Sequence, residues 1–264
     1  MTMPNHATAP IASFEPQAGR VIAVASGKGG VGKTWASIAL AQALTEQRRK
    51  ILLFDGDLGL ANVDVQLGLM PNRNLSLVLA DQIRLKDAVI STDDRGFDVI
   101  AGASGSGDLA SVDPQVLVAT GRSLKELAKN YHHAILDLGA GIGRSIRFMS
   151  VLADTLLVIT TDEPTSITDA YALMKIISTC APGSDIRIVV NMAATLDEGQ
   201  RTYSALVRAC QTFLGISPPL AGVIRRDPAV REAIRAQTPL LSLLPASPAA
   251  QDVKRLANRL DGLA

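Results

Sequence analysis

The stretch SGKGGVGKT, residues 26–34, decides how this 264-residue sequence folds. It follows the apolar run RVIAVA (20–25) and leads into GKTWASIALAQALTEQ (32–47), which has a helical period. Four residues of the stretch match the pattern G-x-x-x-x-G-K-[ST]: Gly27, Gly32, Lys33 and Thr34. Glycines in such a turn let backbone N–H groups approach phosphate oxygens, and the N-terminus of the helix adds partial positive charge. The stretch therefore predicts a phosphate loop between a buried strand and a helix.

The polar residues of the loop predict its ligand. A lysine at the position of Lys33 reaches the β- and γ-phosphates, and a hydroxyl at the position of Thr34 binds Mg²⁺. The alternative, a glycine-rich turn that binds nothing, would leave a buried lysine without an anion, which is costly. We therefore predict ATP and Mg²⁺ as cofactors. The predicted nucleotide-binding residues of the loop are Gly27, Lys28, Gly29, Gly30, Val31, Gly32, Lys33, Thr34 and Trp35.

Apolar runs alternate with helical segments along the rest of the chain. Besides 20–25, the predicted strands are 50–55, 97–103, 133–138, 155–161, 186–191 and 219–224. Helices are predicted within 32–47, where Ile38, Leu40, Ala41 and Leu44 lie on or near one stripe, and over 113–130 and 247–260. This alternation is typical of a parallel sheet covered on both faces. We predict a flexible leader over 1–19 and, over 20–264, a single α/β domain of the P-loop NTPase type. Its sheet should be mostly parallel and twisted, with about seven or eight strands and helices on both faces.

Composition narrows the class of protein. Hydrophobic residues make up 47% of the chain and charged residues 19%, which is enough apolar material for a sizeable core. The formal net charge of +1 gives no indication of nucleic acid or an anionic membrane as a partner. Because no apolar run approaches the roughly 20 residues of a membrane span and the start lacks the pattern of a signal peptide, we expect a cytoplasmic protein. Cys180 and Cys210 are expected to be reduced and buried.

Three aspartates follow predicted strands. Asp55 is the last residue of the strand 50–55, Asp57 follows two positions later, and Asp137 lies near the end of the strand 133–138. Ligands of open α/β sheets bind at this edge, so one carboxylate can serve Mg²⁺ while another orients the attacking water. We predict Thr34 and Asp137 at the metal. Of Asp55 and Asp57, one is predicted to serve Mg²⁺ and the other to orient the water, and the alternative for this pair is that both cap a turn.

A carboxamide and two histidines are less decisive. Asn191 ends the strand 186–191, where it can either pair with the N6 and N7 edge of adenine or cap a turn; the residues alone favour neither. His132 and His133 are predicted to be solvated loop residues.

The segment KGGVGKT (28–34) resembles the deviant phosphate loop of the MinD/ParA class of ATPases. On chemistry alone, Lys28 would be a solvated charge. The resemblance implies instead that Lys28 of one subunit reaches the nucleotide of a second subunit, as an arginine finger does in trans. It also implies that Asp57 orients water while Asp55 serves the metal, that Asn191 contacts adenine, and that ATP produces a homodimer which hydrolyses ATP slowly. The catalytic residues are then Lys28, Lys33 and Asp57.

Within this class, DGDLGLANVDVQLGL (55–69), DLGAGI (137–142) and TTDEPTSITDAYALMK (160–175) resemble the FlhG (FleN) family of flagellar number regulators. The resemblance implies contact with a flagellar GTPase of the signal-recognition type, with C-ring proteins or with a transcriptional activator of flagellar genes, and transient residence at the cell pole or membrane. PQAGR (16–20) departs from the DQAxxLR element of that family, and only DGLA follows the last predicted helix. Stimulation of the GTPase and membrane attachment are therefore not predicted. Trp35 stands where the class has a small polar residue, which predicts weaker nucleotide binding.

Two other functions use the same scaffold. A ParA-type DNA or cargo partition ATPase would need a basic surface, and Arg225, Arg226, Arg231 and Arg235 are the candidates for it. A metabolic enzyme, such as an electron-transfer iron protein or an ATP-dependent synthetase, would need bridging cysteines near the nucleotide or a dedicated substrate pocket. The cysteine positions do not favour the iron protein, and no motif indicates a substrate pocket.

Overall fold

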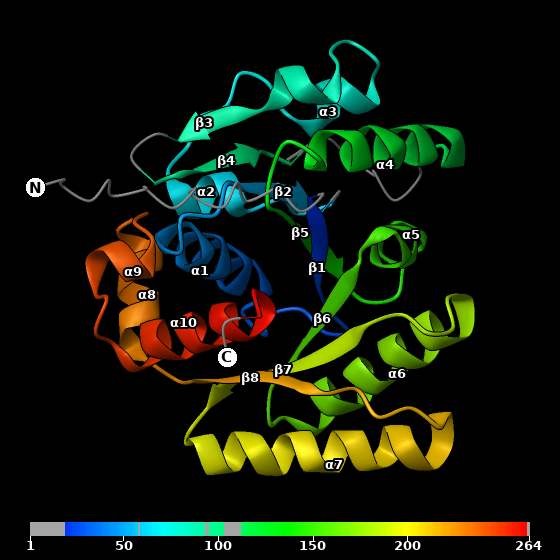
Figure 1. The fold of residues 1–264 in the computed structure, drawn as a ribbon, viewed down its shortest axis with the longest axis vertical. Helices are drawn as coiled ribbons and strands as arrows, with labels where there is room; N and C mark the ends of the chain where they lie inside the picture. Colours follow the sequence, from blue (N-terminus) through cyan, green and yellow to red (C-terminus); the bar gives the residue numbers. More distant parts are fainter. Residues whose placement is uncertain (1–18, 58, 93–94, 103–111, 263–264) are drawn as a thin grey trace, which may run out of the picture.

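A computed structural model describes residues 19–57, 59–92, 95–102 and 112–262. Its centre is an eight-stranded sheet with the order β3-β4-β2-β5-β1-β6-β7-β8 (Figure 1). The strands are β1 (Arg20–Ser26), β2 (Ile51–Gly56), β3 (Ile90–Thr92), β4 (Phe97–Ile100), β5 (His133–Ala140), β6 (Thr155–Thr160), β7 (Ile186–Ala193) and β8 (Leu220–Arg225). All neighbours pair in parallel except β3 and β4. The predicted fold class is confirmed; the predicted leader lies outside the described residues apart from Gly19.

Helices cover both faces of the sheet, and each face has its own apolar core (Figure 1). One face carries α1 (Lys33–Glu46), α2 (Val63–Leu67), α8 (Pro228–Arg235), α9 (Leu240–Leu243) and α10 (Pro248–Leu260). The other carries α3 (Leu75–Leu79), η1 (Leu85–Ala88), α4 (Pro114–Ala128), α5 (Arg144–Leu152), α6 (Pro164–Cys180) and α7 (Leu196–Leu214). None of the helices in the described part of the chain is both long and apolar enough to cross a membrane.

Helix α1 is more deeply buried than its sequence pattern predicts. The sequence predicts an apolar stripe through Ile38 and Leu44, but every residue from Trp35 to Leu44 is buried. The reason is tertiary: α1 packs on β2 and β5 on one side and on α9 and α10 on the other. Small residues such as Ala39 and Ala43 let those elements approach closely, so α1 is an interior helix and not a surface one.

The described structure differs from the sequence-based prediction in four further details. β3 was not predicted, because three residues at a sheet edge give too short a pattern to detect. β4 ends at Ile100, before the predicted end at residue 103. His133 is buried in β5 and not solvated, and Cys180 is exposed at the end of α6 and not buried.

Candidate functional site

The predicted site residues converge at the carboxyl edge of the sheet. β1 lies between β5 and β6, so the chain leaves β1 where neighbouring connections diverge, which is where open α/β sheets bind ligands. The carboxyl ends of β1, β2, β5 and β7 deliver the phosphate loop, Asp55, Asp137 and Asn191 to this one edge. The structure therefore brings together residues that lie more than a hundred positions apart in the sequence.

The phosphate loop has the backbone that its glycines predict. Gly30 and Gly32 adopt left-handed φ angles of 80° and 82°, which L residues with a side chain rarely tolerate. Gly27 lies so close to α6 that an added Cβ would stand 2.1 Å from the carbonyl oxygen of Asp169. A Cβ at Gly32 would stand 2.5 Å from Nδ2 of Asn191. The loop is thus held between α6 and the end of β7, and its glycines at 27 and 32 are sterically required.

Lys33 and Asp137 form a buried ion pair beneath the loop. The ammonium group of Lys33 donates to Oδ1 of Asp137 at 3.1 Å, and the hydroxyl of Ser37 donates to the same oxygen at 3.0 Å. Both charged side chains are at most 8% exposed. Burial raises the pKa of Asp137 above its usual range, although the charge of Lys33 opposes the increase. A triphosphate in the loop offers Lys33 a stronger anion than a carboxylate of raised pKa does.

Asp55 and Asp137 are paired across β2 and β5, so two carboxylates lie side by side in the interior. Burial, followed by the charge of Asp137, raises the pKa of Asp55 to about 7. Oδ1 of Asp55 accepts a hydrogen bond from the backbone N–H of Asp57, and Oδ2 accepts from those of Asn62 and Val63 at the start of α2. Asp55 therefore ties the loop after β2 and the first turn of α2 to the floor of the site.

These residues fit Mg²⁺. Oδ2 of Asp137 is buried and has no hydrogen-bond partner among the described residues, which is the state expected of an oxygen that awaits a donor or a cation. Nearby stand the hydroxyl of Thr34 and the carboxylate of Asp55, and a divalent cation would relieve the repulsion between the two carboxylates. Within the described ranges no three His, Cys, Asp or Glu side chains form a metal-binding group. Mg²⁺ is commonly bound through one or two carboxylates and completes its shell with phosphate and water.

Asp57 lies at the entrance of the site. Its Oδ1 accepts hydrogen bonds from the backbone N–H groups of Gly59 and Leu60 at 3.2 and 3.0 Å. The carboxylate faces the end of β5, since a Cβ at Gly139 would stand 3.2 Å from Oδ1 of Asp57. The two segments that follow β2 and β5 thus meet at Asp57 and Gly139. The role of Asp57 in orienting water remains a prediction.

Lys28 points away from the phosphate loop of its own chain. Its ammonium group donates to Oε2 of Glu163 at 2.6 Å and to the hydroxyl of Thr165 at 2.9 Å, both at the start of α6. The side chain is 36% exposed, and the hydrogen bond and charge of Lys28 lower the pKa of Glu163. Lys28 therefore lies at the outer surface of the site, and its predicted contact with a second subunit's nucleotide remains a prediction.

Asn191 contacts the phosphate loop of its own chain. Its side chain is buried, and Nδ2 donates to the backbone carbonyl of Val31 in the phosphate loop at 2.8 Å. Met192, the next residue, adopts φ of 58°, a strained conformation for a residue with a side chain. Asn191 thus supports the loop from below. Contact with adenine stays a prediction, and Oδ1 of Asn191 is still available to accept a hydrogen bond from the base.

Trp35 contributes to the core and not to the rim of the site. The indole is 5% exposed and lies in the same apolar cluster as Val31 and Ile224. Its Nε1 has no hydrogen-bond partner in the part of the chain that the structure describes. The side chain is one residue from Thr34, so its fluorescence is a natural reporter of nucleotide binding.

Sequence reasoning missed three residues of the site: Ser37, Glu163 and Thr165. Glu163 and Thr165 could have been found from their place directly after a strand. Because β6 is parallel to β1, its carboxyl end reaches the same edge of the sheet as the phosphate loop. Ser37 could have been found as the residue one helical turn after Lys33. Of the four arginines proposed for a DNA-binding surface, Arg225 is already bound to the buried carboxylate of Asp252. That leaves a smaller basic surface than the sequence offers.

The sequence matches a family model described as the CobQ/CobB/MinD/ParA nucleotide binding domain over residues 22–240. It is 37% identical to the antiactivator FleN of Pseudomonas aeruginosa over 92% of this chain and 86% of that protein. It is 29% identical to the flagellum site-determining protein YlxH of Helicobacter pylori, over 91% and 81% of the two chains. The structure resembles the septum site-determining protein MinD of Pyrococcus horikoshii in complex with Mg-ADP, with a TM-score of 0.78, 28% identity, and coverage of 92% and 96%.

Proposed function

Because this chain belongs to the CobQ/CobB/MinD/ParA nucleotide-binding family, we propose that it is a cytoplasmic, ATP-hydrolysing switch that regulates the number or placement of flagella. The single observation that carries the ATPase part is the buried Lys33–Asp137 pair beneath a complete phosphate loop. The flagellar part is supported by the names of two relatives, the antiactivator FleN and the flagellum site-determining protein YlxH.

The site performs this reaction by positioning and charge. The backbone of the phosphate loop holds the triphosphate of ATP, and Lys33 leaves Asp137 to bind its β- and γ-phosphate oxygens. Thr34, Asp55 and Asp137 would hold Mg²⁺, which when bound neutralises phosphate charge and stabilises the charge that develops during transfer. Asp57 at the entrance orients the attacking water.

Lys28 couples the nucleotide to assembly. Two copies face each other at the carboxyl edges of their sheets, and Lys28 of each copy exchanges Glu163 for the triphosphate held by the other. The support is geometric: Lys28 is partly exposed, and its ammonium is held 2.6 Å from a carboxylate on the rim and not by its own loop. A cation supplied by a second copy meets the developing charge only after dimerisation, so hydrolysis depends on the dimer.

The partners follow from the same relatives. Among a flagellar GTPase, C-ring proteins and a transcriptional activator of flagellar genes, the name antiactivator favours the activator for FleN, and we extend this preference to the present chain. Membrane attachment is not part of the proposal.

Light scattering with Mg-ATP tests the switch. Asp57→Ala should block hydrolysis without changing the phosphate loop. This variant should therefore form a stable dimer with ATP and remain monomeric with ADP. Lys28→Ala should bind ATP with unchanged affinity, stay monomeric and lose hydrolysis. A monomeric Asp57→Ala protein at saturating Mg-ATP would contradict the switch.

Electron microscopy of cells tests the biological role. A strain without the gene should carry an altered number or placement of flagella, and wild-type protein should restore the normal pattern. Lys33→Ala should fail to restore it at equal protein level. Normal flagellation in the deletion strain would refute the flagellar role while leaving the ATPase proposal intact.

A further inference from the structure

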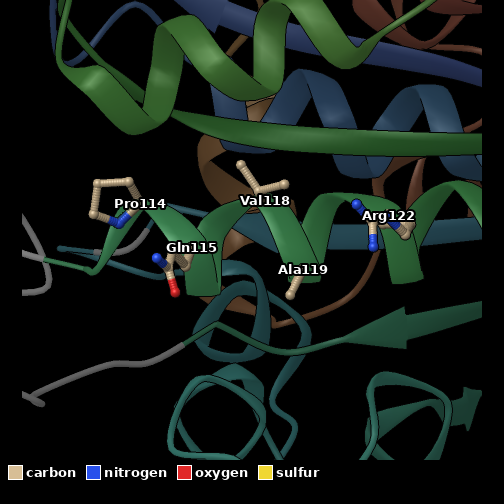
Figure 2. A pocket seen from close by; sticks show the side chains of 5 residues that line it. All are labelled: Pro114, Gln115, Val118, Ala119 and Arg122. Carbon is tan, nitrogen blue, oxygen red and sulfur yellow. The ribbon is translucent and has the colours of Figure 1, made fainter.

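Oδ2 of Asp137 is the one carboxylate oxygen among the described residues that is buried and has no hydrogen-bond partner. The hollow along α4, with a volume of about 390 Å³, differs from the nucleotide site in this respect. Its described lining comes from that helix alone and contains no buried polar atom without a partner: Pro114, Gln115, Val118, Ala119 and Arg122 (Figure 2). The unmet carboxylate oxygen therefore lies at the nucleotide site, and the groups that hold Asp137 decide how Oδ2 is presented to a ligand.

The hydroxyl of Ser37 holds the other oxygen of this carboxylate. Ser37 is fully buried in α1, one helical turn after Lys33, and its hydroxyl donates to Oδ1 of Asp137 at 3.0 Å. The backbone carbonyl of Lys33 lies 3.1 Å from the same hydroxyl, so two acceptors share one proton. In a regular α-helix that carbonyl already accepts the N–H of Ser37, whereas a buried carboxylate needs every donor it can reach. Asp137 is therefore the acceptor that depends on this hydroxyl.

The donors of Asp137 differ in how a bound nucleotide affects them. Lys33 carries its ammonium group on a long, flexible side chain, which in the proposed ATPase leaves Asp137 for the phosphates. The hydroxyl of Thr34, which also lies near this carboxylate, is assigned to Mg²⁺. Ser37 has a single side-chain carbon and lies one turn further along α1, so it stays on Oδ1.

A carboxylate that loses its donors is free to turn. The last side-chain torsion of aspartate has broad minima, so Asp137 without a donor on Oδ1 would present either oxygen in several orientations. With the hydroxyl of Ser37 in place, Oδ1 remains occupied and Oδ2 remains the free oxygen.

We propose that Ser37 is a positioning residue for Mg²⁺, because its hydroxyl keeps Oδ1 of Asp137 bound after Lys33 has turned to the phosphates and so leaves Oδ2 for the metal or its bound water. The inference rests on the proposed ATPase function and extends it to a residue that acts on the metal through Asp137. Hydrogen bonds that orient a metal-binding side chain commonly change metal affinity by about 10–100-fold.

Calorimetry tests the proposal in two titrations of the full chain. Mg²⁺ is titrated into the complex with ADP, with protein in excess so that little free nucleotide remains, and ADP is titrated separately in excess EDTA. Ser37→Ala and Ser37→Cys should each raise the Kd for Mg²⁺ by about tenfold, because both lose the strong donor and cysteine keeps the volume. The Kd for ADP in EDTA should stay within threefold of the wild type, since the phosphate loop and Lys33 are unchanged. Circular dichroism should show both variants folded.

Ser150→Ala is the matched control. Ser150 is a buried serine of α5 whose hydroxyl has no hydrogen-bond partner within the described ranges, so its removal should change either Kd less than twofold.

The remaining outcomes separate this inference from the ATPase proposal. A Kd for Mg²⁺ within threefold of the wild type in both Ser37 variants overturns the inference alone. Equal weakening of Mg²⁺ binding and of metal-free ADP binding also overturns it, because Ser37 would then support the loop as a whole and not the metal. A wild-type protein that binds neither ADP nor Mg²⁺ overturns both proposals.

Discussion

Two opposite edges of the sheet bury aspartates, and the aspartates differ in how they are satisfied. At the amino edge, Asp261 accepts two hydrogen bonds from Arg49 and one from His133. Burial acts to raise the pKa of Asp261, but these partners outweigh it and the pKa lies below its usual range. At the carboxyl edge, burial raises the pKa of Asp137, and one oxygen of that carboxylate has no hydrogen-bond partner in the part of the chain that the structure describes. The hydrogen-bonded network around Asp261 therefore stabilises the packing of the end of α10 against the sheet. The incompletely hydrogen-bonded Asp137 instead indicates a ligand-binding site.

Removing Lys33 at the carboxyl edge should have the largest effect, and it should affect ATP hydrolysis. Lys33→Ala takes away the cation that binds both Asp137 and the triphosphate, so ATP hydrolysis should fall by about 10³-fold, on the order of 4 kcal/mol of transition-state stabilisation. A coupled assay for phosphate release measures this, and calorimetry measures ATP binding. If Lys33→Ala hydrolysed ATP at a rate within tenfold of the wild type, the reaction would not take place at this phosphate loop.

The second largest effect should be a pH dependence of stability that comes from Asp55 at the carboxyl edge. The pKa of Asp55 is about 7 in the folded protein and 3.8 when the chain is unfolded, so the folded state binds more protons between these values. Its contribution to stability is therefore greatest below pH 4 and is lost as pH rises towards 7, by up to about 4 kcal/mol. Asp55→Asn should remove this slope. Urea unfolding without nucleotide at pH 4 to 7 measures it, and parallel curves for the two proteins would contradict the assignment.

Breaking the satisfied network should affect stability and not activity. Arg49→Ala removes the main partner of Asp261, whose side chain is only 5% exposed, and should lower the free energy of unfolding by about 3 kcal/mol. ATP hydrolysis per folded molecule should remain within twofold, because Arg49 lies at the other edge of the sheet. Urea unfolding and a phosphate assay on the same sample measure both quantities. A large loss of activity without loss of stability would show that the edges are coupled.

The smallest effect is expected at the rim of the carboxyl edge. Glu163→Gln removes the charge that holds Lys28 beside α6, and an exposed ion pair of this kind is weak because water screens it. If Lys28 acts on a second subunit, the protein concentration for half-maximal ATPase activity should fall up to about fivefold. The maximal rate at saturating protein should not change. A rise in the required concentration would mean that Glu163 positions Lys28 for the dimer and does not restrain it.

The fold was predictable where local pattern and tertiary structure agree. Gly27, Gly32, Lys33 and Thr34 specify the loop by themselves, because a tight turn and a cation leave few alternatives. The aspartates at strand ends were predictable for a similar reason, since parallel strands deliver their carboxyl ends to one edge.

The missed features depend on contacts that no local pattern contains. The burial of His133 depends on Asp261, which lies 128 positions away in the sequence. The partner of Asn191 is a backbone carbonyl in the phosphate loop, 160 positions away, and Lys28 meets Glu163 across 135 positions. The rule that parallel strands bring their carboxyl ends to one edge predicts that such residues lie near one another. It does not predict which atoms form the hydrogen bonds.

The interior position of α1 has a consequence for motion within the site. Helix α1, into which the phosphate loop continues, is buried from Trp35 to Leu44, so the amide protons of this part of the helix should exchange with deuterium only when the whole domain opens. The backbone of Gly59 and Leu60 is exposed and held chiefly by the carboxylate of Asp57, so its amides should exchange orders of magnitude sooner. Deuterium labelling would then divide the surroundings of the nucleotide site into a protected part, the helix behind the phosphate loop, and a labile part at Gly59 and Leu60.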